Sequence, residues 1–158
     1  MTMKKIILAG VIGLTFGCSN AQKSEKNEAV PEAVKTSFAA KYPNVSKVKW
    51  EKEDNSYEAE FVQNKTEYSA VFDANGNFKE EESEIEVSAL PNSVVDYCKS
   101  NYTDHKISEA AKITTSSGDV QFEAELSKGK MHFDVIFDAN GNFISKGNSS
   151  SEDEEDED

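Results

Sequence analysis

The sequence contains no arginine and only two cysteines, and each shortage argues against a class of protein. Arginine binds phosphate and carboxylate groups through two parallel hydrogen bonds, so its absence argues against a site built to hold such groups. The formal net charge is −13. Nucleic acid is therefore not an expected partner, because binding it needs a basic surface. Cys18 lies near the N-terminus and Cys98 stands alone, so no intramolecular disulfide framework is expected and Cys98 is predicted to be a small buried hydrophobe.

Sequence signatures of catalysis are also absent. His105 and His132 are isolated, and neither stands at a spacing typical of metal ligands. No serine lies in a nucleophile elbow and no glycine-rich loop precedes a helix. Glu58 and Glu60 share one face of a predicted strand and could hold paired carboxylates, but nothing else frames a pocket around them. We therefore expect no enzyme, no cofactor and no metal site, and keep an enzyme without a recognisable motif as the remaining alternative.

The N-terminal residues have the pattern of an export signal. Lys4 and Lys5 precede an apolar stretch from Ile6 to Phe16. A membrane-spanning helix needs about 20 apolar residues, so the stretch predicts a signal peptide over residues 1–17. Cys18 is then the candidate lipidation site and residues 18–29 a flexible tether; cleavage after Ala21 is the alternative. The chain is expected in the periplasm, in the outer membrane or at the cell surface, with any membrane contact made through the lipid anchor.

The other end of the chain is strongly acidic. Residues 148–158 follow Gly147 and finish in an unbroken run of acids from Glu152 to Asp158. Such a run repels itself and has no apolar surface to bury, so it predicts a disordered tail.

An internal repeat dominates the body of the chain. The seven residues Phe72–Phe78 recur without change as Phe137–Phe143. Repetition of this kind indicates that one structural unit occurs twice. The two units are predicted over residues 30–88 and 89–147. The spacing from helix to hairpin is five residues longer in the second unit, which places an insertion near its first strand and the following loop.

Each unit begins with a helix pattern and continues with strand patterns. Pro31 and Pro91 are placed as first helical residues. The apolar residues that follow recur every fourth position, at Val34, Phe38 and Tyr42 and again at Val94, Cys98 and Tyr102. Alternation of apolar and polar residues then indicates half-buried antiparallel strands. The predicted class is α+β, with one helix on four antiparallel strands in each repeat. The two sheets either merge into one eight-stranded sheet or pack separately.

The repeated Asn-Gly pairs predict two-residue hairpins in which both central residues have positive φ. Aspartate and asparagine at alternate positions also suggest calcium ligands. However, glycine is fourth in the turn rather than sixth, and no bidentate glutamate follows. The hairpin explains the same residues, so we expect no calcium there.

This order of elements resembles the PepSY-like family, which is also called β-lactamase-inhibitor-like. The resemblance covers residues 30–146 and rests on Val48-x-Trp50, on Tyr57-x-Ala59-x-Phe61 and on the two Phe-Asp-Ala-Asn-Gly turns. It implies a secreted or envelope protein that binds an enzyme through the uncovered, concave face of its sheet. No inhibitory residue is carried over, because no matching interaction loop is present.

The residues expected on the uncovered face are acidic with a few apolar positions. They are Glu58, Glu60, Val71, Glu123, Glu125, His132, Asp134 and Ile136. We expect a non-catalytic envelope module that binds or inhibits an envelope protein or peptide through this face. The alternative is a cation-responsive or structural acidic lipoprotein that acts through charge alone. Salt separates the two, because diffuse charge effects fade as the Debye length falls to about 8 Å.

Overall fold

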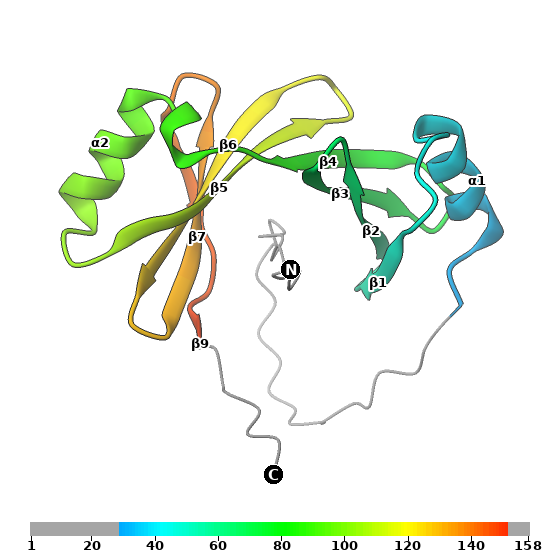
Figure 1. Ribbon diagram of the computed structural model, residues 1–158, viewed down its shortest axis with the longest axis horizontal. Helices are drawn as coiled ribbons and strands as arrows, with labels where there is room; N and C mark the ends of the chain where they lie inside the picture. The colour runs from blue at the N-terminus through cyan, green and yellow to red at the C-terminus, as the bar shows by residue number, and fades with distance from the viewer. Residues whose placement is uncertain (1–28, 152–158) are drawn as a thin grey trace, which may run out of the picture.

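The computed structural model describes residues 29–151, which form an arched antiparallel sheet with both helices on its convex side (Figure 1). The elements are α1 (Glu32–Lys41), β1 (Lys49–Glu53), β2 (Ser56–Gln63), β3 (Thr66–Asp73), β4 (Phe78–Glu84), the 3-10 helix η1 (Val87–Ala89), α2 (Asn92–Asn101), β5 (Lys106–Thr115), β6 (Val120–Lys128), β7 (Met131–Asp138), β8 (Phe143–Lys146) and β9 (Ser150–Ser151). The predicted signal peptide, Cys18, most of the tether and the acidic run of the tail lie outside the described residues. No helix within 29–151 is long and apolar enough to cross a membrane.

The sheet runs continuously through both repeats. Strands β1 to β8 pair with their sequence neighbours, all antiparallel. The two repeats join where β4 pairs with β5, from Glu80 opposite Thr115 to Glu84 opposite Ala111. The predicted fold class is therefore confirmed, and the two sheets merge into one. A short strand that the sequence did not suggest, β9, also pairs with β7.

The longer spacing in the second repeat appears in its first strand. β1 has 5 residues and pairs only with β2, whereas β5 has 10 residues and pairs on both sides, with β4 and with β6. The strand that joins the repeats thus has to satisfy hydrogen-bonding groups along both of its edges. The extra residues give it the length to do so.

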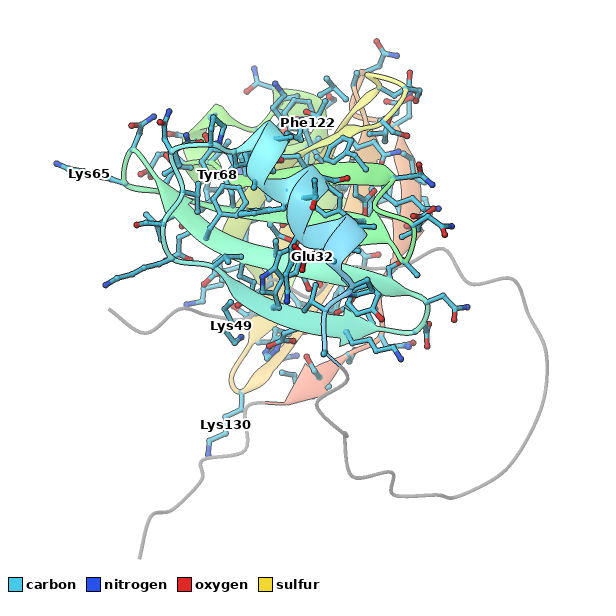
Figure 2. The ribbon with its side chains drawn as sticks, turned by 90° about the vertical axis from the view of Figure 1, so that its right-hand side faces the viewer. Glu32, Lys49, Lys65, Tyr68, Phe122 and Lys130 are labelled. Atoms are coloured by element: carbon cyan, nitrogen blue, oxygen red, sulfur yellow. The ribbon has the colours of Figure 1, made fainter. Side chains whose placement is uncertain are left out.

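The first helix covers the first repeat through an aromatic cluster (Figure 2). Val34 and Phe38 are buried, as the four-residue spacing predicts. The Phe38 ring lies 5.2 Å from that of Trp50 and 5.3 Å from that of Phe61, both edge-on, which is a favoured geometry for aromatic pairs. Pro31 occupies the N-cap position rather than the first helical position that was predicted, and its carbonyl accepts the first helical hydrogen bond.

The second repeat has its own core under α2. Cys98 occupies the place that Phe38 has in the first repeat, and Tyr97 supplies the aromatic ring, stacked on Phe143 at 5.4 Å and edge-on to Phe137 at 5.3 Å. Cys98 is 2 % exposed, and burial raises the pKa of its thiol to about 11. The prediction that Cys98 is a small buried hydrophobe is confirmed.

The two Asp-Ala-Asn-Gly turns have a different conformation from the one predicted. Only the glycines, Gly76 and Gly141, have positive φ, and Asn75 and Asn140 do not. The prediction of positive φ at both central residues was wrong for these turns; that pattern occurs instead at Asn64 and Lys65, between β2 and β3. The reason is the aspartate at the start of each turn, whose side chain organises the backbone around itself.

Asp73 shows how this works. One carboxylate oxygen accepts the backbone N–H groups of Asn75 and Asn77, both at 2.9 Å, and the other accepts the Asn77 amide at 2.8 Å. Asp138 makes the equivalent three bonds in the second repeat. These hydrogen bonds hold the pKa of both aspartates below the usual value. The repeated aspartates and asparagines are thus explained by turn formation.

Candidate functional site

The uncovered side of the sheet carries the residues that the sequence placed there. Cross-strand pairing sets Glu58 opposite Val71, Glu123 opposite Ile136, and Glu125 opposite Asp134. Residues directly opposite each other in an antiparallel pair share a face. We call this side, with its buried side chains Glu58, Glu60, Glu82, Glu123 and Asp134, the acidic face.

These acids are buried, which the sequence did not indicate. Glu58 and Glu82 are 1 % exposed, and Glu60 and Glu123 are 6 % exposed. Four apolar residues, Val71, Ala111, Ile113 and Ile136, are buried on the same face although they belong to neither helix-covered core. Burying a carboxylate costs free energy unless hydrogen bonds or opposite charges compensate. The hydrogen bonds and neighbouring charges of each acid therefore determine how far its pKa is shifted.

Toward the β1 edge the carboxylates have partners. Lys49 donates to Glu51 at 2.6 Å and to Glu60 at 2.8 Å, and these contacts raise the pKa of the lysine. Ser69 donates a short hydrogen bond to Glu58. Burial nevertheless outweighs that bond and raises the pKa of Glu58 to about 7.

Among the described residues, one cluster has a geometry that could hold a metal ion, and it lies in this region. Ligand oxygens of Glu51, Glu58 and Glu60 lie within 4.8 Å of one another. Lys49 already donates to two of these carboxylates and Ser69 to the third. A cation of the chain itself thus takes the place where a divalent ion would bind.

Near the joint between the repeats, two carboxylates lack such partners. Both oxygens of Glu82 and one oxygen of Glu123 are buried without a hydrogen bond. Burial raises the pKa of both groups well above the usual value, and the nearby acids Asp134 and Glu80 add to the effect. On β7, burial and Glu125 raise the pKa of Asp134 to about 6. The centre of the acidic face thus favours protonated carboxyl groups more than the solvent-exposed surface does.

Sequence reasoning missed Glu82, and the reason lies in β4. This strand reads Lys-Glu-Glu-Glu-Ser-Glu after Phe78, so it shows no alternation of apolar and polar residues. Glu81 points to the helix side, where it accepts a hydrogen bond of 2.5 Å from the Tyr42 hydroxyl, while Glu82 points to the uncovered side. Because acids lie on both faces of β4, its sequence shows no alternation that would assign Glu82 to one face. Counting alternate residues from the hairpin would also assign Glu82 to the wrong face, because a bulge interrupts the β3–β4 register between Val71 and Phe72.

The remaining predicted face residues lie toward the β7 end. Glu125 is half-buried and accepts a hydrogen bond of 2.5 Å from Ser108. His132 pairs with Ser127 of β6 and with Ser150 of β9, away from the unpartnered carboxylates. The structure thus places Glu123 and Asp134 within electrostatic range of Glu82, which also interacts with Glu58, and leaves His132 at the margin.

Comparison with known proteins agrees with this architecture. The family model described as "Putative beta-lactamase-inhibitor-like, PepSY-like" matches residues 20–67 and 55–145. Comparison with curated proteins gave no significant match.

Several solved structures share the fold. A BLIP-like protein from Bacteroides fragilis is 21% identical with a TM-score of 0.60, over 82% of this chain and 93% of that one. A DUF2874 family protein from Bacteroides ovatus is 15% identical with a TM-score of 0.65, over 82% and 94%. A protein from Bacteroides eggerthii, described as one of the "putative periplasmic proteins", is 15% identical with a TM-score of 0.67, over 77% of this chain and 90% of that one. The chain belongs to the PepSY-like, β-lactamase-inhibitor-like family.

Proposed function

We propose that this chain is a non-catalytic binding module of the cell envelope, and that its acidic face docks a protein with a basic surface. The observation that carries the proposal is the burial of five acids on the side of the sheet that neither helix covers. Envelope location is supported by the predicted export signal and by the description of the Bacteroides eggerthii relative. Lipidation at Cys18 would tether the module to a membrane.

The energetics favour a binding role over a structural one. Apolar residues of similar size at the same positions would stabilise the sheet at least as well, because burying an ionisable group costs free energy unless partners compensate. The presence of carboxylates at the centre of this face therefore suggests that they serve binding rather than stability. Complementary charge across an interface gives partner choice and fast association, which fits an acidic face meeting a basic partner.

The most specific form of the proposal is inhibition or sequestration of an envelope enzyme. It is supported by the family description and by the BLIP-like relative. The described histidines give little support for catalysis. His105 packs against the rings of Tyr102 and Phe133, and His132 lies away from the central carboxylates.

Charge reversal should remove the binding. The chain from residue 22 onward, which includes every helix and strand of the structure, would be immobilised and exposed to native envelope extract at physiological salt. We expect a retained protein, and we expect the double variant Glu60→Lys and Glu125→Lys to lose it by at least about tenfold, because like charges would then oppose a basic partner. Retained proteins would be quantified by mass spectrometry.

A control with the same net charge is available on other surfaces. Glu86 precedes η1 and Asp96 lies on α2, and both are exposed. The variant Glu86→Lys and Asp96→Lys should retain the partner within about twofold if the face itself matters rather than total charge. Equal loss in both double variants, or retention in both, would contradict docking through the acidic face.

A further inference from the structure

The joint between the repeats places two unpartnered carboxylates close together on the acidic face. Glu82 of β4 is opposite Ile113 of β5, and Glu123 of β6 is opposite Ala111 of the same strand. Ile113 and Ala111 are two residues apart and thus share a face. Glu82 and Glu123 therefore flank β5 from its two sides, over a floor made by one small and one branched apolar side chain.

Within the described residues, two side-chain donors of this face are engaged elsewhere. Ser69 is opposite Glu82 but donates to Glu58. Lys49 donates to Glu51 and Glu60. This leaves three carboxylate oxygens buried without a hydrogen bond, Oε1 and Oε2 of Glu82 and Oε2 of Glu123. Buried polar atoms of native proteins nearly always have a partner, so such a group calls for an explanation.

We propose that Glu82 and Glu123 receive an arginine side chain of the docked partner, with its guanidinium group hydrogen-bonded to both carboxylates. This inference rests on the proposed function and names the group that the acidic face recognises. A guanidinium carries five N–H donors in a planar fork and is more weakly hydrated than an ammonium, which suits several buried acceptors. Apolar Val71, Ile113 and Ile136 would contact the aliphatic part of the arginine.

Binding is coupled to proton release. In the free protein burial raises the pKa of Glu82 and Glu123, and nearby acids including Glu80 and Asp134 add to the effect, so their protonated forms are favoured relative to an exposed carboxyl. The guanidinium favours the ionised forms, so the protons pass to the buffer when arginine binds.

The test uses two blocked tripeptides, Ala-Arg-Ala and its neutral analogue with citrulline in place of arginine. Each is titrated into the isotope-labelled chain from residue 22 onward, and the side-chain carboxyl resonances of Glu82 and Glu123 are followed by NMR between about pH 6 and pH 8. We expect both resonances to shift with the arginine peptide and the titration midpoint to fall by about one pH unit or more. Citrulline should bind at least about tenfold more weakly.

Variants identify the carboxylates. Glu82→Gln and Glu123→Gln keep the shape and remove the charge, and each should weaken the arginine peptide by about tenfold or more. Glu84→Gln is the matched control, since Glu84 lies on the same strand and face as Glu82 but is exposed, and it should change the affinity by less than about twofold. Circular dichroism would check that each variant is folded.

Three results would overturn the proposal: equal binding of the citrulline peptide, full binding by both glutamine variants, or stronger shifts of the same resonances with calcium chloride alone. The last would indicate a metal site instead of an arginine site. Failure of this proposal can be told apart from failure of the docking proposal. A captured envelope protein that is lost with the Glu60 and Glu125 reversals but unaffected by Glu82→Gln would leave docking intact and refute the arginine site alone.

Discussion

Replacing Gly76 with alanine is expected to lower the free energy of unfolding by about 3 kcal/mol. Gly76 has φ +83°, and a Cβ there would lie 2.6 Å from the Ala33 carbonyl oxygen and 2.7 Å from Ser37 Oγ. The first of these atoms belongs to the backbone of α1 and cannot rotate away. The hairpin between β3 and β4 and the helix would have to separate. Urea unfolding followed by circular dichroism measures the loss.

The second repeat and an open turn supply the controls for this prediction. Gly141 has the same role, since its Cβ would meet Ser93 Oγ at 1.9 Å and Ser93 Cβ at 2.8 Å, so Gly141→Ala should also be strongly destabilising. Gly118 has φ +89° with nothing within 4 Å of its Cβ position. Gly118→Ala should therefore cost only the backbone strain, about 1 kcal/mol. Equal effects at all three glycines would show that helix contact is unimportant in the repeated turn.

The second large effect is a loss of stability as the pH rises. The free energy of unfolding is expected to fall by about 3 kcal/mol from about pH 5 to pH 8. Glu58 and Asp134 have pKa values raised to about 7 and about 6, and burial raises those of Glu82 and Glu123 well above the usual value. In this range the folded protein binds more protons than the unfolded chain, so raising the pH favours unfolding. The stabilisation is complete below the ordinary carboxyl pKa and is lost as the pH passes each raised value.

Asp73 and Asp138 have the opposite dependence. Their pKa values are lowered by hydrogen bonds within the turns, so their contribution is lost when the pH falls below the usual aspartate range. Stability should thus be greatest near about pH 5. Urea unfolding across the range measures the profile. Glu82→Gln should flatten its alkaline side, whereas Glu86→Gln, at an exposed position, should not. A profile that rises toward pH 8 would contradict the assignment of protonated carboxyls to the acidic face.

The two proposals and the pH prediction share one physical cause. Carboxylates at the joint between the repeats destabilise the free protein when they ionise, and a cationic partner would reverse that effect. Binding of the arginine group should thus stabilise the folded protein more at pH 8 than at pH 5, because ligand binding to the folded state adds to its stability. The strength of docking would then depend on the pH of the compartment in which the protein lies.

Local periodicity in the sequence was enough to predict several features of this protein. The four-residue spacing of Val34 and Phe38 identified the buried side of α1, and the two-residue alternation of Glu58 and Glu60 with Ala59 identified the two faces of β2. The identical heptapeptides revealed the duplication. Each of these features lies within one helix, strand or turn, where side-chain direction follows directly from residue spacing.

The junction of the sheets, the burial of Glu82 and the conformation of the turns could be read only from the folded protein. Whether the sheets merge depends on pairing between β4 and β5, whose partners lie about 30 residues apart, from Glu84 with Ala111 to Glu80 with Thr115, and no local pattern encodes it. The run of acids in β4 hid the burial of Glu82, because acids lie on both faces of this strand and only its pairing with β3 and β5 assigns Glu82 to the uncovered side. The turn conformation depended on the three hydrogen bonds to Asp73 and on the contact of Gly76 with α1. These outcomes depend on contacts between segments, which only the folded chain brings together.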